Sequence, residues 1–207
     1  MVTPIRFFGF DSLMEFIAFA IASAVAFQAL KGYRLSKERT LLYLNVSFGL
    51  LGAGLFIDAC ANLIVFLARF HAEFLFLYSI GYTINFVAQL LAYGILVFAY
   101  IQQSRDVVSQ VAMAAAPALL FVEYNAVTEL ILLFLVVYIT TQTAINYSVN
   151  KSNTALLVFG AFASLSMAHL FFLFFTLLPV FFALAHIAQL FGFLLLLAML
   201  LRVNHVP

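Results

Sequence analysis

The sequence predicts an all-α integral membrane protein with seven transmembrane helices. Of its 207 residues, 67% are hydrophobic and only 8% are charged, whereas a soluble domain is about 25% charged. The mean hydropathy is +1.17, and the apolar residues form long stretches separated by short polar segments. This composition excludes a soluble enzyme and a disordered chain. It also excludes a nucleic-acid-binding protein, because 9 Lys and Arg against 8 Asp and Glu provide no basic surface.

Seven stretches approach the roughly 20 apolar residues that a helix needs to cross a bilayer. In chain order they are residues 12–30, 41–68, 74–101, 107–122, 126–145, 155–177 and 180–201. The basic segment 31–39 ends the first stretch, and the charged segments 69–73 and 102–106 end the second and third. The fourth stretch is the shortest and contains Pro117.

The last three stretches are bounded by Asn, Pro and basic residues. The fifth begins after Asn125 and is followed by polar residues up to Lys151. Pro179 marks the turn between the sixth and the seventh, and Arg202 follows the seventh. We therefore expect one membrane domain over residues 1–207, with no separate soluble domain.

The distribution of basic residues predicts the orientation, because cytoplasmic segments carry an excess of Lys and Arg. With seven spans and the N-terminus outside, the inside segments hold Lys31, Arg34, Lys37, Arg39, Arg105, Lys151 and Arg202. Only Arg6 and Arg69 then lie outside. Omitting the span at 107–122 would move Lys151 outside, so this bias favours the fourth helix. We predict a multi-pass protein of the cell membrane with its C-terminus inside.

Polar residues recur at constant offsets, which indicates an internal duplication. The matched pairs are Asp11 with Asn125, Glu15 with Glu129, Gln28 with Gln142, Tyr33 with Tyr147 and Lys37 with Lys151, all 114 residues apart, followed by Asp58 with His169 and Gln89 with Gln189. The first repeat covers about 11–105 and the second about 125–203. A linker helix at 107–122 would make the two three-helix repeats parallel.

This arrangement of three, one and three helices resembles the SWEET and PQ-loop transporters. The resemblance also involves the helix ends that contain Gln28 and Gln142, each followed by a Tyr and a Lys at matching positions. The Pro of the Pro-Gln motif in that family is replaced by Phe27 and Thr141. The resemblance implies a transporter in which two parallel repeats enclose the substrate.

Ionisable residues within membrane spans are costly and by default mark function. Five such residues fall in the outer half of the predicted bundle: Glu15, Asp58, Glu129, His169 and His186. Neutral polar residues follow the same helical spacing: Asn62 shares a face with Asp58, Gln189 shares a face with His186, and Asn85 and Gln89 lie on one face of the third stretch. We predict that these nine side chains line one polar pocket that faces the outside.

The predicted pocket admits several functions. Carboxylates beside histidines can exchange protons near neutral pH, so the first hypothesis is binding and translocation of a small solute, ion or proton. The second is a sensor or signalling membrane subunit that acts through a partner chain. The third is a cofactor-binding subunit, with a divalent metal on Glu129, His169 and His186 or a haem between the two histidines.

A structural role is also open, because polar side chains hold membrane helices together. No nucleophile with a neighbouring base is recognisable, so we expect no catalytic residue. Membrane lipid is an expected partner, and the chain could pair with a second copy or another membrane subunit.

Overall fold

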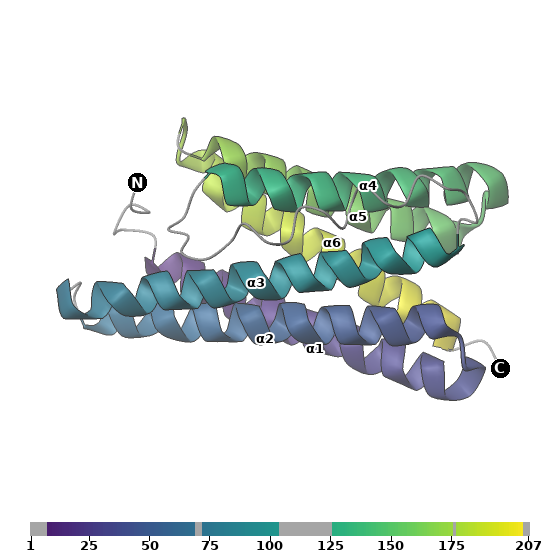
Figure 1. The fold of residues 1–207 in the computed structure, drawn as a ribbon, viewed down its shortest axis with the longest axis horizontal. Helices are drawn as coiled ribbons and strands as arrows, with labels where there is room; N and C mark the ends of the chain where they lie inside the picture. The colour runs from purple at the N-terminus through teal and green to yellow at the C-terminus, as the bar shows by residue number, and fades with distance from the viewer. Residues whose placement is uncertain (1–7, 69–71, 104–125, 176, 205–207) are drawn as a thin grey trace.

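The computed structural model describes residues 8–68, 72–103, 126–175 and 177–204, which form six helices and no strand (Figure 1). The helices are α1 (Phe8–Ser36), α2 (Arg39–Leu67), α3 (Ala72–Gln103), α4 (Ala126–Asn150), α5 (Asn153–Phe174) and α6 (Val180–Asn204). Each is long and apolar enough to cross a membrane. The chain is therefore a multi-pass membrane protein.

The predicted count of seven helices was wrong, because the described residues contain six. The expected helix at 107–122 lies outside the described residues. That stretch is shorter than the roughly 20 residues needed for a span, and it contains Pro117, which removes a helical hydrogen bond. The helix at 107–122 was predicted because a seventh span places Lys151 at the same end as most of the other basic residues.

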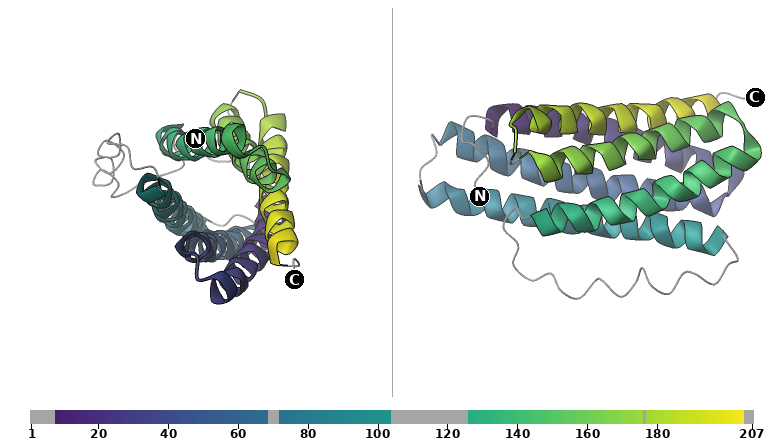
Figure 2. Two further views of the ribbon diagram at one scale, coloured as in Figure 1. Left: turned by 90° about the vertical axis from the view of Figure 1, so that its right-hand side faces the viewer. Right: turned by 90° about the horizontal axis from the view of Figure 1, so that it is seen from above.

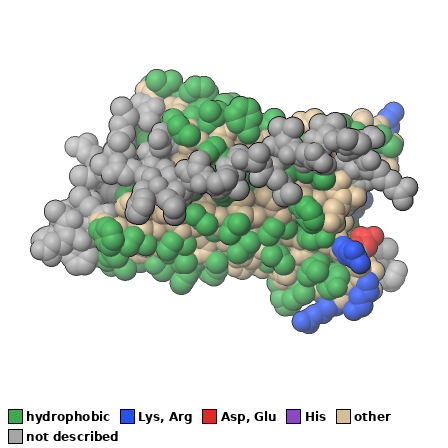
Figure 3. Space-filling view, viewed as in Figure 1, with side chains coloured by type: hydrophobic (Ala, Val, Ile, Leu, Met, Phe, Trp, Pro, Cys, Tyr) green, Lys and Arg blue, Asp and Glu red, His purple; other side chains and the backbone are tan. Residues whose placement is uncertain are grey.

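Lys151 lies at that end with six helices as well. The helices α1, α3, α4 and α6 run in one direction, and α2 and α5 run in the other (Figure 1). The end of α3 and the start of α4 are therefore at opposite ends of the bundle, as are the start of α1 and the end of α6 (Figure 1). The six described Lys and Arg residues, Lys31, Arg34, Lys37, Arg39, Lys151 and Arg202, gather at the end where α1 and α6 finish (Figure 3).

The six helices form a closed ring in the order α3, α2, α1, α6, α5, α4 (Figure 2). Contacts are extensive within α1–α3 and within α4–α6. They are sparser between α1 and α6, and sparsest between α3 and α4. The bundle thus consists of two halves, α1–α3 and α4–α6, that meet along two smaller interfaces.

The two halves repeat the same turn between their first and second helices. Only residues 37–38 separate α1 from α2, and only residues 151–152 separate α4 from α5. Lys37 and Lys151 both have positive φ (61° and 47°), and their backbone N–H groups donate to Tyr33 and Tyr147 at 2.8 Å. The internal duplication stays a prediction, and these identical turns support it.

The outer surface of the bundle is apolar, as contact with lipid requires. Large side chains such as Phe27, Phe134 and Phe191 are more than half exposed on it, and hydrophobic side chains cover its flank between the ends (Figure 3). The interior holds a layer of fully buried side chains that includes Phe48, Tyr93 and Phe193.

An acidic cavity and an apolar barrier

One cavity lies among all six helices, near the end opposite the basic residues. Its volume is about 60 Å³, which is room for on the order of four water molecules or a small ion. It is lined by Asp11, Glu15, Leu55, Asp58, Tyr78, Tyr82, Asn85, Gln89, Glu129, His169, Phe172, Phe175, Phe182, His186 and Gln189. We call it the acidic cavity because four carboxyl groups line it.

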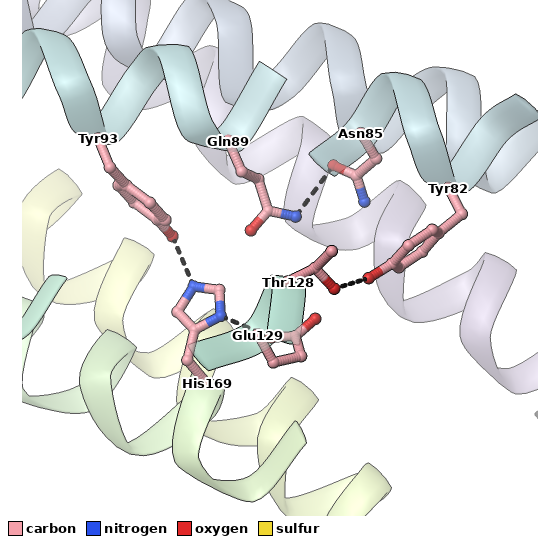
Figure 4. A network of polar contacts seen from close by, with 7 residues as sticks. All are labelled: Tyr82, Asn85, Gln89, Tyr93, Thr128, Glu129 and His169. Carbon is pink, nitrogen blue, oxygen red and sulfur yellow. Dashed lines mark hydrogen bonds and ion pairs between the residues drawn. The ribbon is translucent and has the colours of Figure 1, made fainter. Parts of the chain in front are cut away.

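A carboxylate and a histidine of the second half form a hydrogen-bonded chain with a tyrosine of the first half. His169 Nδ1 lies 2.9 Å from Glu129 Oε2, and its Nε2 lies 3.1 Å from the Tyr93 hydroxyl. Figure 4 shows that Tyr93, on α3, reaches across to His169 on α5. Nearby, the hydroxyls of Tyr82 and Thr128 are 2.6 Å apart and join α3 to α4. These contacts connect the two halves around the cavity.

In the first half, Asp11 bridges three helices. Its Oδ1 lies 2.9 Å from His186 Nε2 on α6, and its Oδ2 accepts a hydrogen bond from Asn62 Nδ2 on α2 at 3.1 Å. The same Asn62 amide donates to Glu15 Oε2 at 3.0 Å. Asp58 Oδ2 accepts from Asn85 Nδ2 at 2.9 Å. Glu15 and Asp58 lie within hydrogen-bonding reach of each other.

The cavity carries an excess of negative charge. Asp11, Glu15, Asp58 and Glu129 are each at most 8% exposed, and His169 and His186 are the basic side chains among the lining residues. With both histidines protonated and all four carboxyls ionised, the formal charge is −2 (2 − 4). Buried charges without counter-charges are strongly unfavourable, so this cavity requires protons or another cation.

Several oxygen atoms around the cavity lack a hydrogen-bond donor. Among the described residues, Asp58 Oδ1, Asn62 Oδ1 and Gln89 Oε1 are buried and have no hydrogen-bond partner. All three are acceptors, and buried acceptors are normally paired. The arrangement is therefore short of donors as well as of positive charge.

A layer of buried side chains closes the acidic cavity toward the basic end. It consists of Phe48, Leu51, Tyr93, Leu165 and Phe193, each at most 1% exposed, and we call it the apolar barrier. The rings of Phe48 and Phe193 meet edge to face with centroids 5.4 Å apart. The Tyr93 hydroxyl bonds to His169 on the cavity side, so the barrier and the polar network share one residue.

A second cavity lies beyond the apolar barrier. Its volume is about 340 Å³, and its lining includes Leu96 and Tyr100 on α3, Phe162 on α5 and Met199 on α6. In the sequence, Leu96 and Tyr100 come after the barrier residue of α3, Met199 comes after that of α6, and Phe162 comes before that of α5. The second cavity reaches the exposed residues Glu38 and Thr40 at the basic end. The residues of the apolar barrier thus lie between the two cavities along α2, α3, α5 and α6.

The structure brings the predicted pocket residues together. Glu15, Asp58, Asn85, Gln89, Glu129, His169, His186 and Gln189 all line the acidic cavity. Asn62 does not line it but hydrogen-bonds two acids at the cavity, Asp11 and Glu15. Whether these residues bind a ligand stays a prediction.

Sequence reasoning missed Asp11 as a pocket residue, because it was placed just outside the first span. Its position four residues before Glu15, on the same helical face, was the available signal. Tyr93 was also missed as the partner of a histidine, because that contact joins residues 76 positions apart in the sequence.

The three metal candidates do not converge. Glu129 and His169 pair with each other, whereas His186 pairs with Asp11. Across the described part of the chain, no group of three or more His, Cys, Asp or Glu side chains could hold a metal ion. His169 has both ring nitrogens engaged, so neither nitrogen is free to ligate a haem iron.

Comparisons of this chain with known protein families, with curated proteins and with solved structures find no match.

Proposed function

We propose that this protein is a membrane transporter that binds a small cation, a proton included, in the acidic cavity and carries it across the bilayer. The observation behind the proposal is a buried cavity with four carboxyl groups, two histidines and no Lys or Arg among its described lining residues. A neutral or anionic solute would leave its negative charge uncompensated, whereas a cation would neutralise it.

The second cavity supports transport rather than binding alone. A transported cation needs access to its site from both sides in turn, and the residues of the apolar barrier lie between the two cavities. The halves meet along interfaces smaller than those within each half, so rocking of one half against the other would disturb few contacts. The resemblance to SWEET and PQ-loop transporters stays a prediction that agrees with such a motion.

The charge distribution supports an orientation. All six described Lys and Arg residues lie at the end of the bundle that faces away from the acidic cavity. By the positive-inside rule that end faces the cytoplasm, so the acidic cavity faces the outside. A cation entering from outside would then meet the carboxyl groups first.

Flux measurements in liposomes test the proposal. The purified chain is reconstituted, and gradients of H⁺, Na⁺ and K⁺ are imposed one at a time while dyes report the internal concentration. We expect flux of at least one of these cations, and a loss of at least tenfold in D58N and E129Q, which neutralise one acid in each half. A tenfold loss of flux corresponds to a free-energy barrier for transport that is higher by about 1.4 kcal/mol.

The matched control is L13A, since Leu13 lies between the two acids of α1 but is 57% exposed on the lipid-facing side. It should transport like the wild type. No flux of any of the three cations, or equal flux in wild type, D58N and E129Q, would contradict the proposal. Cation binding without flux would instead favour a sensor.

A further inference from the structure

The four acids of the acidic cavity fall into three pairings. Asp11 pairs with His186 and Glu129 with His169, each at 2.9 Å. The remaining acids, Glu15 and Asp58, both line the cavity and lie close enough to interact, and Asp58 Oδ1 is buried without a hydrogen-bond partner among the described residues. We propose that Glu15 and Asp58 together hold one proton, so that this carboxyl pair is the proton-binding group of the cavity. The inference rests on the proposed function and names the proton as the bound cation.

Two carboxyl groups in contact need a hydrogen between them. An ionised carboxylate only accepts hydrogen bonds, whereas a protonated one also donates. Glu15 and Asp58 lie within hydrogen-bonding reach, and that contact is a hydrogen bond only if one of them carries a proton. Two carboxylates that share a buried site cannot both ionise, because like charges in a region of low dielectric repel each other strongly.

The neighbouring donors do not replace this proton. The Asn62 amide is divided between Asp11 and Glu15, and among the described residues the Asn85 side-chain amide donates to Asp58 Oδ2. Asp58 Oδ1 is buried and receives no hydrogen bond from any described residue, although Asp58 is 4% exposed and lines the cavity. A proton on the pair supplies the donor and cancels one negative charge.

In the second half, the positions that correspond to Glu15 and Asp58 hold an acid and a histidine instead of two acids. Glu129 corresponds to Glu15 (129 − 15 = 114), and His169 corresponds to Asp58 (169 − 58 = 111). His169 can bring its own proton to Glu129, whereas Asp58 brings another acid to Glu15. A proton must therefore come from solvent in the first half, which makes this half the one that takes up protons.

A proton fits this position better than a metal ion does. No described group of three or more His, Cys, Asp or Glu side chains could hold a metal, and Asp11 already engages His186 and Asn62. The other titratable groups that face the pair are Asp11 on α1, Tyr78 and Tyr82 on α3, Glu129 on α4, His169 on α5 and His186 on α6. Of these, only the histidines can add positive charge.

Infrared spectroscopy tests the proposal without requiring flux. A protonated carboxylic acid has a C=O stretch that is separate from the carboxylate bands and shifts in D₂O. We expect this band in the wild-type protein near neutral pH and expect it to disappear in E15Q and in D58N. In each variant the new amide donates an N–H to the remaining carboxylate, which removes the need for the proton.

Two further variants sharpen the test. E129Q should keep the band, because it changes only the carboxylate–histidine pair of the second half. D58H gives the first half the partner type of the second half and should remove the band. Helical circular dichroism and thermal unfolding of each variant verify that it is folded.

Absence of the band in the wild type, its persistence in both E15Q and D58N, or its loss only in E129Q would overturn the proposal. So would stabilisation of the wild type by Na⁺ together with absence of the band, since a metal ion would then occupy the pair. If the band is present but no cation flux is found, the Glu15–Asp58 pair holds a proton and the transport proposal is rejected. If cation flux is found without the band, the transport proposal stands and the proton pair is rejected.

Discussion

Asp11 joins helices from both ends of the chain, because its two carboxylate oxygens bind side chains on α2 and α6. Its partner His186 is 175 residues away in sequence and 3% exposed. The aromatic rings of Phe172 and Phe182 pack edge-on against His186, with centroids 5.1 and 4.8 Å away. The ion pair is therefore enclosed by aromatic side chains, where an unpaired charge would be costly.

Removing one partner of this pair should destabilise the protein. In H186A the Asp11 carboxylate keeps only the Asn62 amide, and breaking a buried pair in this way typically costs about 3–5 kcal/mol. D11N should cost less, since its amide oxygen can still accept from His186. The measurement is the free energy of unfolding in detergent micelles.

The double variant D11N/H186A separates loss of charge compensation from loss of packing. If the uncompensated carboxylate causes the destabilisation, the double variant should be more stable than H186A alone. A double variant no more stable than H186A would assign the effect to the lost imidazole ring instead.

At the scale of elements, α2 and α3 approach closely beside the Glu15–Asp58 pair. A Cβ at Gly81 would lie 2.6 Å from the Ala61 Cβ and 3.1 Å from Asp58 Oδ1. The 2.6 Å distance is shorter than real Cβ contacts, and the 3.1 Å distance is tight, so a glycine lets α3 come this near to α2. A Cβ at Gly94, on the same helix, would meet no atom of another element within 4 Å.

The two glycines of α3 therefore predict opposite effects of the same substitution. G81A should force α2 and α3 apart and lower the free energy of unfolding by about 1–3 kcal/mol. G94A should raise it by about 0.5–1 kcal/mol, because alanine favours the helix over glycine. Thermal unfolding of both variants measures this, and a destabilised G94A beside an unaffected G81A would refute the close approach.

At the scale of the whole molecule, the apolar barrier decides whether the two cavities communicate. Phe193 lies fully buried on α6 and packs against Phe48 from α2 across the interior. The barrier therefore depends on side chains from both halves and exists only while the ring is closed.

Truncating the barrier should create a leak. F193A removes the ring that meets Phe48, so we expect a faster passive proton leak in liposomes and a stability loss of about 3–5 kcal/mol. F193L, which fills more of the space, should leak less if F193A proves too unstable to reconstitute. The control is F191A on the same helix, where Phe191 is 56% exposed to the lipid side. Equal leak rates in F193A and F191A would argue against a barrier at this layer.

The sequence determined the class of the protein, six of its helices and most of the residues that meet in the acidic cavity. It could do so because long apolar stretches predict spans and because ionisable residues inside such stretches are rare enough to stand out. The seventh span, expected at 107–122, was inferred from charge bias, and that stretch is the shortest of the seven and contains Pro117.

Only the tertiary structure decided which acid pairs with which partner. A membrane helix is apolar on its lipid side as well as on its packed side, so its hydrophobic pattern does not fix the face that turns inward. The pairing of Asp11 with His186, the facing carboxyls of Glu15 and Asp58, and the barrier between the cavities all depend on closure of the ring. That closure joins α1 to α6, the first and last helices of the chain.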